Sequence, residues 1–359
     1  FKQKTAYEIM PSLVGSEMCI RDRFTLRAFL NGRIDLAQAE SVLDIVTART
    51  QASLRLALQG LRGGLSGAVK SLRSELMSTL AYLTARIDFP EDEVEPQDVV
   101  QSLSESLARL RGLIATADSG IVYRQGVRTA IVGRPNVGKS SLLNRLLRQD
   151  RSIVTPIPGT TRDTVEEVVN LRGVPFLLVD TAGIIHSKDV VESLGVERSR
   201  RAVEQADLVL LVLDISEPLS DADRDIIALI GDRPALVAAN KSDLRQEAQI
   251  DGLPWEVVRT SALTGDGLSE LEARMVNLAL GGDVVTCDAL MVANPRHKAA
   301  LERAEKSLVQ ALDGVASGLP DDFITIDLTA ALNCLGEITG ETVHEELLEA
   351  IFSNFCVGK

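Results

Sequence analysis

Several kinds of residue are scarce in this chain of 359 residues, and each scarcity excludes a class of protein. The four cysteines, Cys19, Cys287, Cys334 and Cys356, have neither the spacing of metal ligands nor that of a disulfide framework. A reducing cytoplasm is therefore the simplest location. Aromatic residues make up only 3% of the chain, which disfavours a surface that stacks single-stranded nucleic acid. No apolar run approaches the ~20 residues of a membrane-spanning helix, so we expect no membrane association.

Positive charge is also in short supply, since the formal net charge is −13. So acidic a chain does not grip nucleic acid through a broad basic surface of its own, although a site shared with a basic partner stays open. Hydrophobic residues at 45% and charged residues at 25% are ordinary values for a globular protein. The length allows two or three domains, each with its own core.

The first 23 residues differ from everything that follows them. The stretch YEIMPSLVGSEMCIRDR, residues 7–23, has no clear periodicity and resembles a recurrent translation of sequencing-adaptor DNA. We interpret residues 1–23 as a foreign leader, with a natural disordered leader as the alternative. Pro11, Gly15 and Ser16 interrupt any apolar segment, so no signal peptide is expected.

Helical patterns lie on both sides of the middle of the chain. Leu36, Ala39, Leu43 and Val46 recur at spacings of three and four, which is typical of one face of a helix. Five further helices are predicted, over about 65–87, 99–117, 294–312, 321–338 and 341–355. An acidic, proline-bounded loop, DFPEDEVEP, follows the first of these. We therefore predict one helical domain in two halves, residues 24–122 and residues 283–359.

Between these halves, from Val127 onward, the hydrophobic period changes to that of β-strands. Six strand-like runs follow, most of them separated by helical patterns: VRTAIVG, VEEVVNL, PFLLVD, DLVLLVLD, PALVAAN and EVVRT. This alternation indicates βαβ units and a mainly parallel sheet, inserted as residues 123–282 into the helical domain. The Arg172-Gly173 turn is too short to hold a helix, so the second and third strands should form an antiparallel hairpin.

The sequence GRPNVGKS, residues 133–140, follows a strand, precedes a helix and fits the phosphate-loop pattern G-x-x-x-x-G-K-[ST]. Its glycines let backbone N–H groups wrap phosphates, and the helix N-terminus adds a favourable dipole. Lys139 is expected to contact the β- and γ-phosphates and the Ser140 hydroxyl to bind Mg²⁺. A plain glycine turn before a helix is the alternative. The residues of this loop that we expect to contact the nucleotide are Asn136, Val137, Gly138, Lys139, Ser140 and Ser141.

Two later motifs are expected to sense the γ-phosphate. In DTAG, which ends a strand, Asp180 can reach Mg²⁺ through water and the Gly183 N–H can meet the γ-phosphate. The stretch TPIPGTTRD, residues 155–163, is the candidate switch I. Thr161 is our candidate for the hydroxyl that senses Mg²⁺ and the γ-phosphate, with Thr160 as the second candidate. A plain threonine-rich loop is the alternative.

Two more motifs are expected to read the base. NKSD places Asn240, Lys241 and Asp243 at another strand end. Asp243 can accept two hydrogen bonds from guanine N1 and N2, which adenine cannot donate. In SAL, a backbone amide of the stretch that begins with Ser261 and Ala262 should support guanine O6. The four motifs together predict a domain that binds GTP and GDP.

These motifs resemble those of one family, MnmE (also called TrmE), the tRNA-modification GTPases. The resemblance runs from FTLRAFLNGRIDLAQAE, residues 24–40, through the nucleotide motifs to LGEITG, residues 335–340, and FCVGK at the end. It covers nearly everything after Arg23. The family usually ends Cys-Ile/Leu-Gly-Lys, so Val357 is a mild departure. The fold class is thus a Ras-like α/β P-loop GTPase domain inserted into an all-α helical domain.

The family resembles the cation-activated GTPases, which implies a mechanism. Where Ras-like proteins hold a glutamine that positions water, this chain has Ile184, which cannot orient water. The resemblance implies K⁺ beside the β–γ bridge, where it supplies the charge that an arginine finger supplies elsewhere. Its expected ligands are Asn136 and switch I groups at Thr155, Ile157 and Thr160. A loop-stabilising amide is the alternative role for Asn136.

By the same resemblance Glu192, in VVESLGVER, orients the attacking water through a bridging water. On the sequence pattern alone, a solvated helix face is the alternative. K⁺-dependent pairing of two GTPase domains across their nucleotide faces is also implied.

The end of the chain carries a second implied site. The last expected helix has an apolar stripe, and Thr342 and Glu345 fit a capping box. Cys356 lies just beyond the stripe, where a stray thiol is the alternative. The resemblance implies that this cysteine serves tRNA modification rather than GTP hydrolysis, while Cys334 fits a buried position better.

The reaction implied by the resemblance is modification of the wobble uridine at C5 in certain tRNAs, adding an aminomethyl or carboxymethylaminomethyl group. The family works in the cytoplasm with MnmG, a partner that uses FAD and NADH. A tetrahydrofolate derivative supplies the one-carbon unit from an N-terminal domain that also forms the constitutive homodimer. Because the resemblance starts at Phe24, we expect that domain to be missing here.

Two other functions stay open on the sequence. A ribosome-assembly GTPase would have a similar nucleotide domain but a basic RNA-binding appendage. In a nucleotide-gated scaffold, GTP would only set the orientation of the helices.

Overall fold

The computed structural model describes residues 24–89, 96–149, 167–179, 200–248, 250, 252–282, 290–342 and 351. They divide into two compact units. The helical unit comprises the described residues of Phe1–Ala48, Leu54–Ile121 and Thr286–Lys359, and the sheet unit those of Arg49–Ser53 and Val122–Val285. The sheet unit thus interrupts the helical unit in the sequence, which confirms the predicted fold class.

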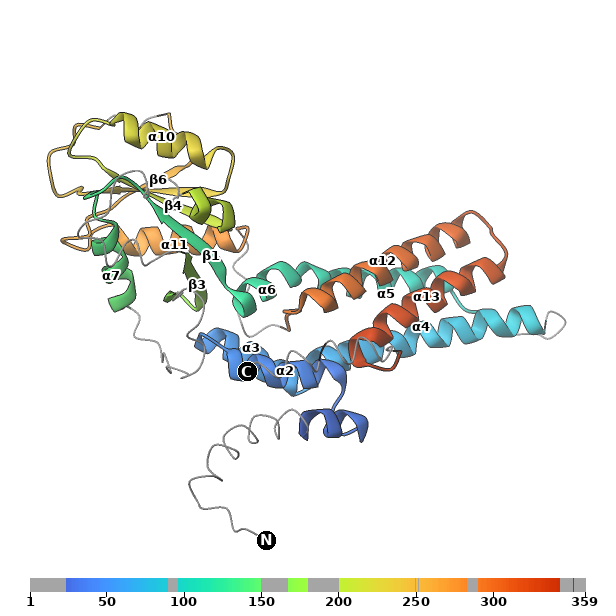
Figure 1. Cartoon of the computed structure of the whole chain (residues 1–359). Coiled ribbons are helices and arrows are strands. Elements are labelled where there is room, and N and C mark those ends of the chain that lie inside the picture. Colours follow the sequence, from blue (N-terminus) through green and yellow to red (C-terminus); the bar gives the residue numbers. More distant parts are fainter. Residues whose placement is uncertain are drawn as a thin grey trace, which may run out of the picture. The chain divides into compact units, whose positions relative to one another are not determined.

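The helical unit is a bundle in which α4, α5, α12 and α13 pack side by side (Figure 1). Its helices are α2 (Leu36–Thr47), α3 (Gln51–Leu61), α4 (Gly64–Asp88), α5 (Val99–Ala115), α6 (Ala117–Gln125), α12 (Pro295–Ala316) and α13 (Asp321–Thr339), of which α3 and α6 extend into the sheet unit. Leucines from both halves of the chain share one core, among them Leu72, Leu103, Leu301 and Leu328. The two halves therefore bury each other's apolar faces, as predicted. None of the described helices is both long and apolar enough to cross a membrane.

The apolar stripe predicted for α2 is correct only at its beginning. Leu36 and Ala39 are buried, but Val46, in the last turn, is 54% exposed. Two polar residues, Glu40 and Ser41, are buried in its place. The reason is that α2 is held in the unit by polar contacts that a hydrophobic period does not report.

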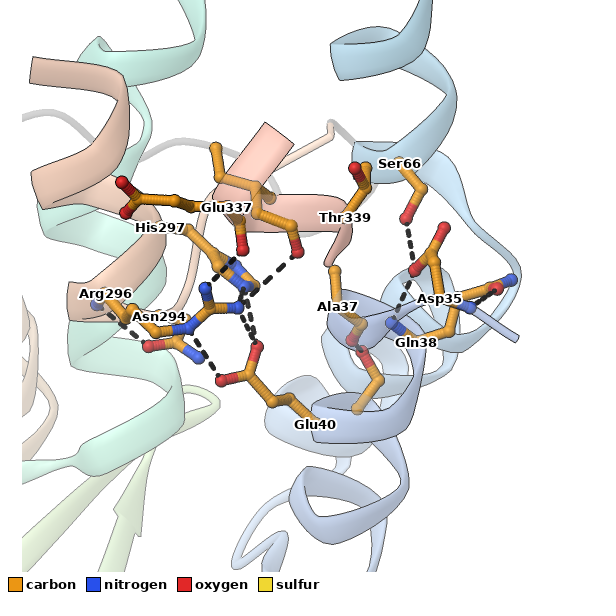
Figure 2. Close-up of polar contacts among 12 residues, drawn as sticks. Asp35, Ala37, Gln38, Glu40, Ser66, Asn294, Arg296, His297, Glu337 and Thr339 are labelled. Atoms are coloured by element: carbon orange, nitrogen blue, oxygen red, sulfur yellow. Dashed lines mark hydrogen bonds and ion pairs between the residues drawn. The ribbon is translucent and has the colours of Figure 1, made fainter. Parts of the chain in front are cut away.

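Figure 2 shows those contacts, with Glu40 directed at Arg296 and His297 at the start of α12. Arg296 donates from Nε and Nη2 to the two Glu40 carboxylate oxygens, at 3.0 and 2.7 Å. His297 Nε2 lies 2.7 Å from Glu40 Oε2. Arg296 Nη1 also donates to the Glu337 carbonyl near the end of α13, at 2.7 Å. One buried carboxylate thus ties α2 to α12, and through Arg296 to α13.

The pKa of Glu40 reflects this setting. Burial alone would raise the pKa, but the hydrogen bonds and charges of His297 and Arg296 outweigh burial and lower it to about 2. Glu40 is therefore ionised at neutral pH and balances the guanidinium charge.

The sheet unit has six strands in the order β2-β3-β1-β4-β5-β6. They are β1 (Val127–Val132), β2 (Glu167–Leu171), β3 (Val174–Val179), β4 (Leu208–Asp214), β5 (Ala235–Asn240) and β6 (Glu256–Arg259). Strand β2 pairs antiparallel with β3, and every other pair is parallel. The predicted hairpin is confirmed. Its turn residues Arg172 and Gly173 have φ of +52° and +97°, a pattern that matches the right-handed twist of the strands.

Helices cover both faces of the sheet, with α10 (Asp221–Ile230) on one side and α11 (Leu268–Ala279) on the other (Figure 1). Helix α7 (Lys139–Gln149) follows β1 through the phosphate loop, residues 133–140. Because β1, β4, β5 and β6 are parallel, their carboxyl ends meet at one edge of the sheet. That edge receives the loops after β1, β5 and β6, which carry the phosphate loop and the NKSD and SAL motifs.

Candidate nucleotide-binding site

The phosphate loop has a backbone that only certain residues allow. At Gly133 a Cβ would lie 2.4 Å from the Val212 carbonyl oxygen, and at Gly138, with φ +99°, 2.3 Å from Asn240 Nδ2. The loop therefore passes too close to β4 and β5 for any side chain at these two positions. Asn136, between them, has φ +65° although it is not glycine. Asparagine tolerates this left-handed conformation better than most residues.

Lys139, the first residue of α7, points back into the loop. Its Nζ donates to the carbonyl oxygens of Gly133 and Arg134, at 2.6 and 2.7 Å. An ammonium group has three N–H donors, so one is left for a phosphate oxygen. Burial lowers the pKa of Lys139 to about 8. Among the described residues, the contacts of this ammonium group are the two carbonyl oxygens of the loop.

Ser140 and Ser141 are exposed in the first turn of α7. Backbone N–H groups of that turn point toward the loop, and the helix dipole favours an anion there. The described residues contain no group of three or more His, Cys, Asp or Glu side chains that could hold a metal ion. Mg²⁺ is usually bound by one or two protein oxygens, substrate phosphates and water. Ser140 would supply one such oxygen.

Asn240, at the end of β5, joins three motifs. Its Nδ2 donates to the Val137 carbonyl at 2.7 Å, and its Oδ1 accepts from the Ala262 N–H at 3.0 Å. The side chain is 1% exposed, so both hydrogen bonds are shielded from water. The phosphate loop, the NKSD loop and the SAL loop therefore form one connected structure. The Ala262 N–H, which is one of the SAL backbone amides, donates to Asn240, and which amide of the stretch supports guanine O6 stays a prediction.

The neighbouring residues hold the base-reading carboxylate. Ser261 donates from Oγ to Asp243 Oδ1 at 2.5 Å, and the Thr264 N–H donates to Ser261 Oγ at 3.1 Å. Asp243 itself is exposed. Ser261 thus fixes one oxygen of an exposed carboxylate in the loop that follows β5.

The side chain of Lys241 is held in place by an ion pair. It has φ +64°, and its ammonium pairs with Asp214 at the end of β4. Burial alone would raise the pKa of Asp214, but the hydrogen bonds from Lys241 and Ser216 outweigh burial and lower it. The aliphatic part of the Lys241 side chain is therefore held in a fixed position at the candidate nucleotide site.

Three residues that the sequence analysis did not single out support this site. Asp214 ends strand β4, and a polar residue at the end of a strand is the signal by which the sequence could have identified it. Arg145 on α7 donates to the carbonyls of Ala262, at 3.1 Å, and Leu263, at 2.5 Å. Arg134, inside the phosphate loop, contacts Glu217. Nothing in the local pattern marked either arginine.

Several predicted residues lie outside the described residues, and their roles stay predictions. They are Thr155, Ile157, Thr160, Thr161, Asp180, Gly183, Ile184, Glu192, Glu345 and Cys356. Residues 1–23 and most of the acidic loop are in the same position. Cys334, by contrast, is half-buried against the helical core, where burial raises the pKa of its thiol.

A mainly parallel sheet with a phosphate loop after β1, a half-buried lysine at the start of α7 and an Asn–Lys–Asp motif after β5 defines a P-loop GTPase. A family model described as the MnmE helical domain matches residues 36–356. A "tRNA modification GTPase MnmE" from Roseiflexus sp. (strain RS-1) is 52% identical over 358 residues, and the match covers 96% of this chain and 77% of that protein. The protein of the same name from Chloroflexus aurantiacus is 49% identical, with the same coverage. The chain belongs to the MnmE family.

A solved structure of Era with MgGDPNP and nucleotides of 16S ribosomal RNA is 33% identical, over 50% of this chain and 66% of that one. Its TM-score is 0.31, and so low a value supports no conclusion about fold or partner.

Proposed function

We propose that this protein is a K⁺-activated GTP hydrolase that takes part in modifying the wobble uridine of certain tRNAs at C5, together with a MnmG-type FAD- and NADH-dependent partner. The single observation that carries the proposal is 52% identity to a tRNA modification GTPase over nearly the whole chain. The nucleotide site built by Lys139, Asn240 and Asp243 supports the first half of it.

In this proposal the described residues act by position and charge. Lys139 and the N–H groups of the phosphate loop stabilise the negative charge of the β- and γ-phosphates, as phosphoryl transfer requires. Asp243 selects guanine, because a base without the N1 and N2 donors leaves its carboxylate unpaired. Mg²⁺, bound with the Ser140 hydroxyl, supplies further positive charge next to the phosphates.

The K⁺ part of the proposal rests on Asn136. Its side chain is exposed, and the amide makes no hydrogen bond with any described residue. This favours a ligand role over the loop-stabilising alternative. The loop also holds Asn136 in a left-handed conformation, and strained backbone positions of this kind cluster at functional sites. Glu192 completes the proposal as the residue that orients the attacking water.

Phosphate release in K⁺ and in Na⁺ tests the hydrolytic mechanism. We expect release to be about tenfold faster or more in K⁺, and this stimulation to disappear in Asn136→Ala and in Glu192→Ala. Asn144→Ala is the matched control, because Asn144 is an exposed amide on α7, eight residues away. Hydrolysis that is indifferent to the monovalent ion would refute the mechanism. No hydrolysis at all in wild type would favour a nucleotide-gated scaffold.

Variants of two of the four cysteines test the part of the proposal that concerns tRNA modification. With the MnmG-type partner, its cofactors, a one-carbon donor and tRNA, Cys356→Ser should abolish the modified nucleoside measured by mass spectrometry and leave GTP hydrolysis unchanged. Cys334→Ser is the control, since Cys334 packs against the helical core, and it should retain both activities. Loss of modification in both variants alike would contradict a specific role for Cys356.

A transition-state mimic tests the association of two chains. We expect GTPase domains to pair when GDP, aluminium fluoride and K⁺ are all present, and not when Na⁺ replaces K⁺. Sedimentation velocity measures this. A mass that does not depend on the ion would contradict pairing across the nucleotide faces.

A further inference from the structure

Arg134 occupies an unusual position in the phosphate loop. Its own carbonyl is one of the two oxygens that hold Lys139 Nζ, at 2.7 Å. Pro135 follows it, which disfavours a helical backbone at Arg134. That side chain is only 21% exposed. Arg134 therefore touches the phosphate-binding lysine with its backbone while its guanidinium reaches elsewhere.

The guanidinium ends between two carboxylates. Its Nη2 donates to Glu217 Oε2 at 2.7 Å, and its Nε lies 3.3 Å from Asp223 Oδ2. Asp223 is 2% exposed and belongs to the capping box of α10, where it accepts hydrogen bonds from the N–H and Oγ of Ser220. Asp223 cannot move without disturbing that helix end. The contact with Asp223 thus anchors the phosphate loop to α10, the helix that follows β4.

We propose that Arg134 is a positioning residue for Lys139. The Gly133 and Arg134 carbonyls aim the lysine only while their two peptide planes keep one orientation. Gly133 has no side chain to fix it, so among the described residues the guanidinium of Arg134 anchors that side of the loop. On the far side, Asn240 anchors the Val137 carbonyl. With both anchors in place, the phosphate loop has its binding conformation before the nucleotide arrives.

Two features separate this role from an ordinary surface ion pair. An exposed pair contributes less than a buried one, and Glu217 alone, with a side chain 60% exposed, would be an exposed pair. The buried Asp223 makes the other half of the contact rigid. Arginine also suits the place better than lysine, because its planar fork reaches two carboxylates at once whereas an ammonium is a point charge.

Nucleotide affinity tests the proposal, measured with fluorescent GDP and GTP analogues on the full chain. Arg134→Met should bind both nucleotides about tenfold more weakly, since one charge-assisted anchor of the loop is lost. Arg134→Lys should recover only part of the loss. Arg224→Met is the matched control, because Arg224 forms an exposed ion pair with Asp221 on α10 and should bind as wild type does.

The preference for GTP over ITP gives a readout that a general loss of structure would move. ITP lacks the exocyclic amine that Asp243 reads, so this ratio reports the base-binding loops. We expect it to stay unchanged in Arg134→Met while the affinity for both nucleotides falls. Fluorescence of Trp255, the single tryptophan of the chain, in the sheet unit, checks that the variant is folded at the assay temperature.

Glu217→Gln keeps the proposal testable if Arg134→Met does not fold. It removes the charge of one acceptor at an exposed position and should weaken nucleotide binding about threefold. Adding it to Arg134→Met should cause no further loss, because both changes break the same contact. Wild-type affinity in Arg134→Met, an equal loss in Arg224→Met, additive losses in the double variant, or full-strength binding by Glu217→Gln would each overturn it. The inference rests on GTP binding at this loop, so it can fail or hold independently of K⁺ activation and tRNA modification.

Discussion

Replacing Glu40 by glutamine should destabilise the helical unit by about 3 kcal/mol at neutral pH. The Glu40 carboxylate lies in a setting where Glu40, Arg296 and His297 are 10%, 19% and 6% exposed, and Glu40→Gln leaves the guanidinium without its counter-charge. Breaking a buried ion pair in this way costs about 3–5 kcal/mol. The pKa of Glu40, about 2 instead of the ordinary 4.5, gives an independent figure of about 3 kcal/mol through linkage. The two arguments agree.

The pH dependence of this effect has a definite sign. A carboxyl whose folded pKa is lowered contributes stability that is fully present above its unfolded pKa and is lost as the pH falls through the folded value. The Glu40 contribution should therefore be complete above about pH 5, about half as large at pH 3, and absent below pH 2. The difference between wild type and Glu40→Gln should shrink over the same range.

Urea unfolding at pH 7 and pH 3 measures this, followed by circular dichroism at 222 nm, which the long helices dominate. The Trp255 fluorescence transition belongs to the sheet unit and should not move. Glu337→Gln is the control, because the Glu337–Arg303 pair lies in the same unit but is 28% and 55% exposed, and should cost under about 1 kcal/mol. A loss that is equal at both pH values, or no larger than the control, would refute the reasoning.

Three further predictions concern the sheet unit. The pKa of Lys139 lies at about 8, and a bound phosphate would raise it, so GTP binding at pH 8 should take up protons and should weaken as the pH rises further. Calorimetry in two buffers of different ionisation enthalpy measures this proton uptake. Proton release on binding would contradict the prediction. Asp243→Asn should lose its preference for GTP and gain affinity for xanthosine triphosphate, which competition binding shows; an unchanged preference would mean that another group reads the base. Thr50→Val should destabilise the sheet unit by about 1–2 kcal/mol in the Trp255 transition, because Thr50 Oγ1 donates to the Gly173 carbonyl at 2.8 Å. Thr84→Val, whose hydroxyl is exposed on a helix, should have almost no effect on the same transition.

Local patterns predicted the elements well where the period was long and uninterrupted. The helix expected over 65–87 is α4, Gly64–Asp88, and the one expected over 321–338 is α13, Asp321–Thr339. The hairpin followed from a turn too short for a helix. On α2 the same method placed Val46 in the core, although Val46 is exposed. It was wrong there because a hydrophobic period cannot report that the polar side chain of Glu40 takes the place of an apolar contact.

The nucleotide motifs were readable because each is a short stretch whose chemistry is local. Gly133, Gly138 and Lys139 must stand at fixed spacing for one loop to wrap a phosphate, and Asp243 must follow Asn240 at a fixed distance for one strand end to read a base. Such constraints act over a few residues, so they can be recognised without any knowledge of the fold.

The amino-acid sequence by itself therefore predicted the six strands, most of the long helices and the insertion of one domain in the other, and it supplied the motifs from which GTP-binding residues are predicted. Only the tertiary structure decided which distant charges pair: Glu40 with Arg296, 256 positions away, and Arg134 with Glu217, 83 positions away. The physical reason is that backbone periods and loop motifs arise from neighbouring residues, whereas an ion pair between distant residues exists only after the packing of helices and strands has brought its two members together.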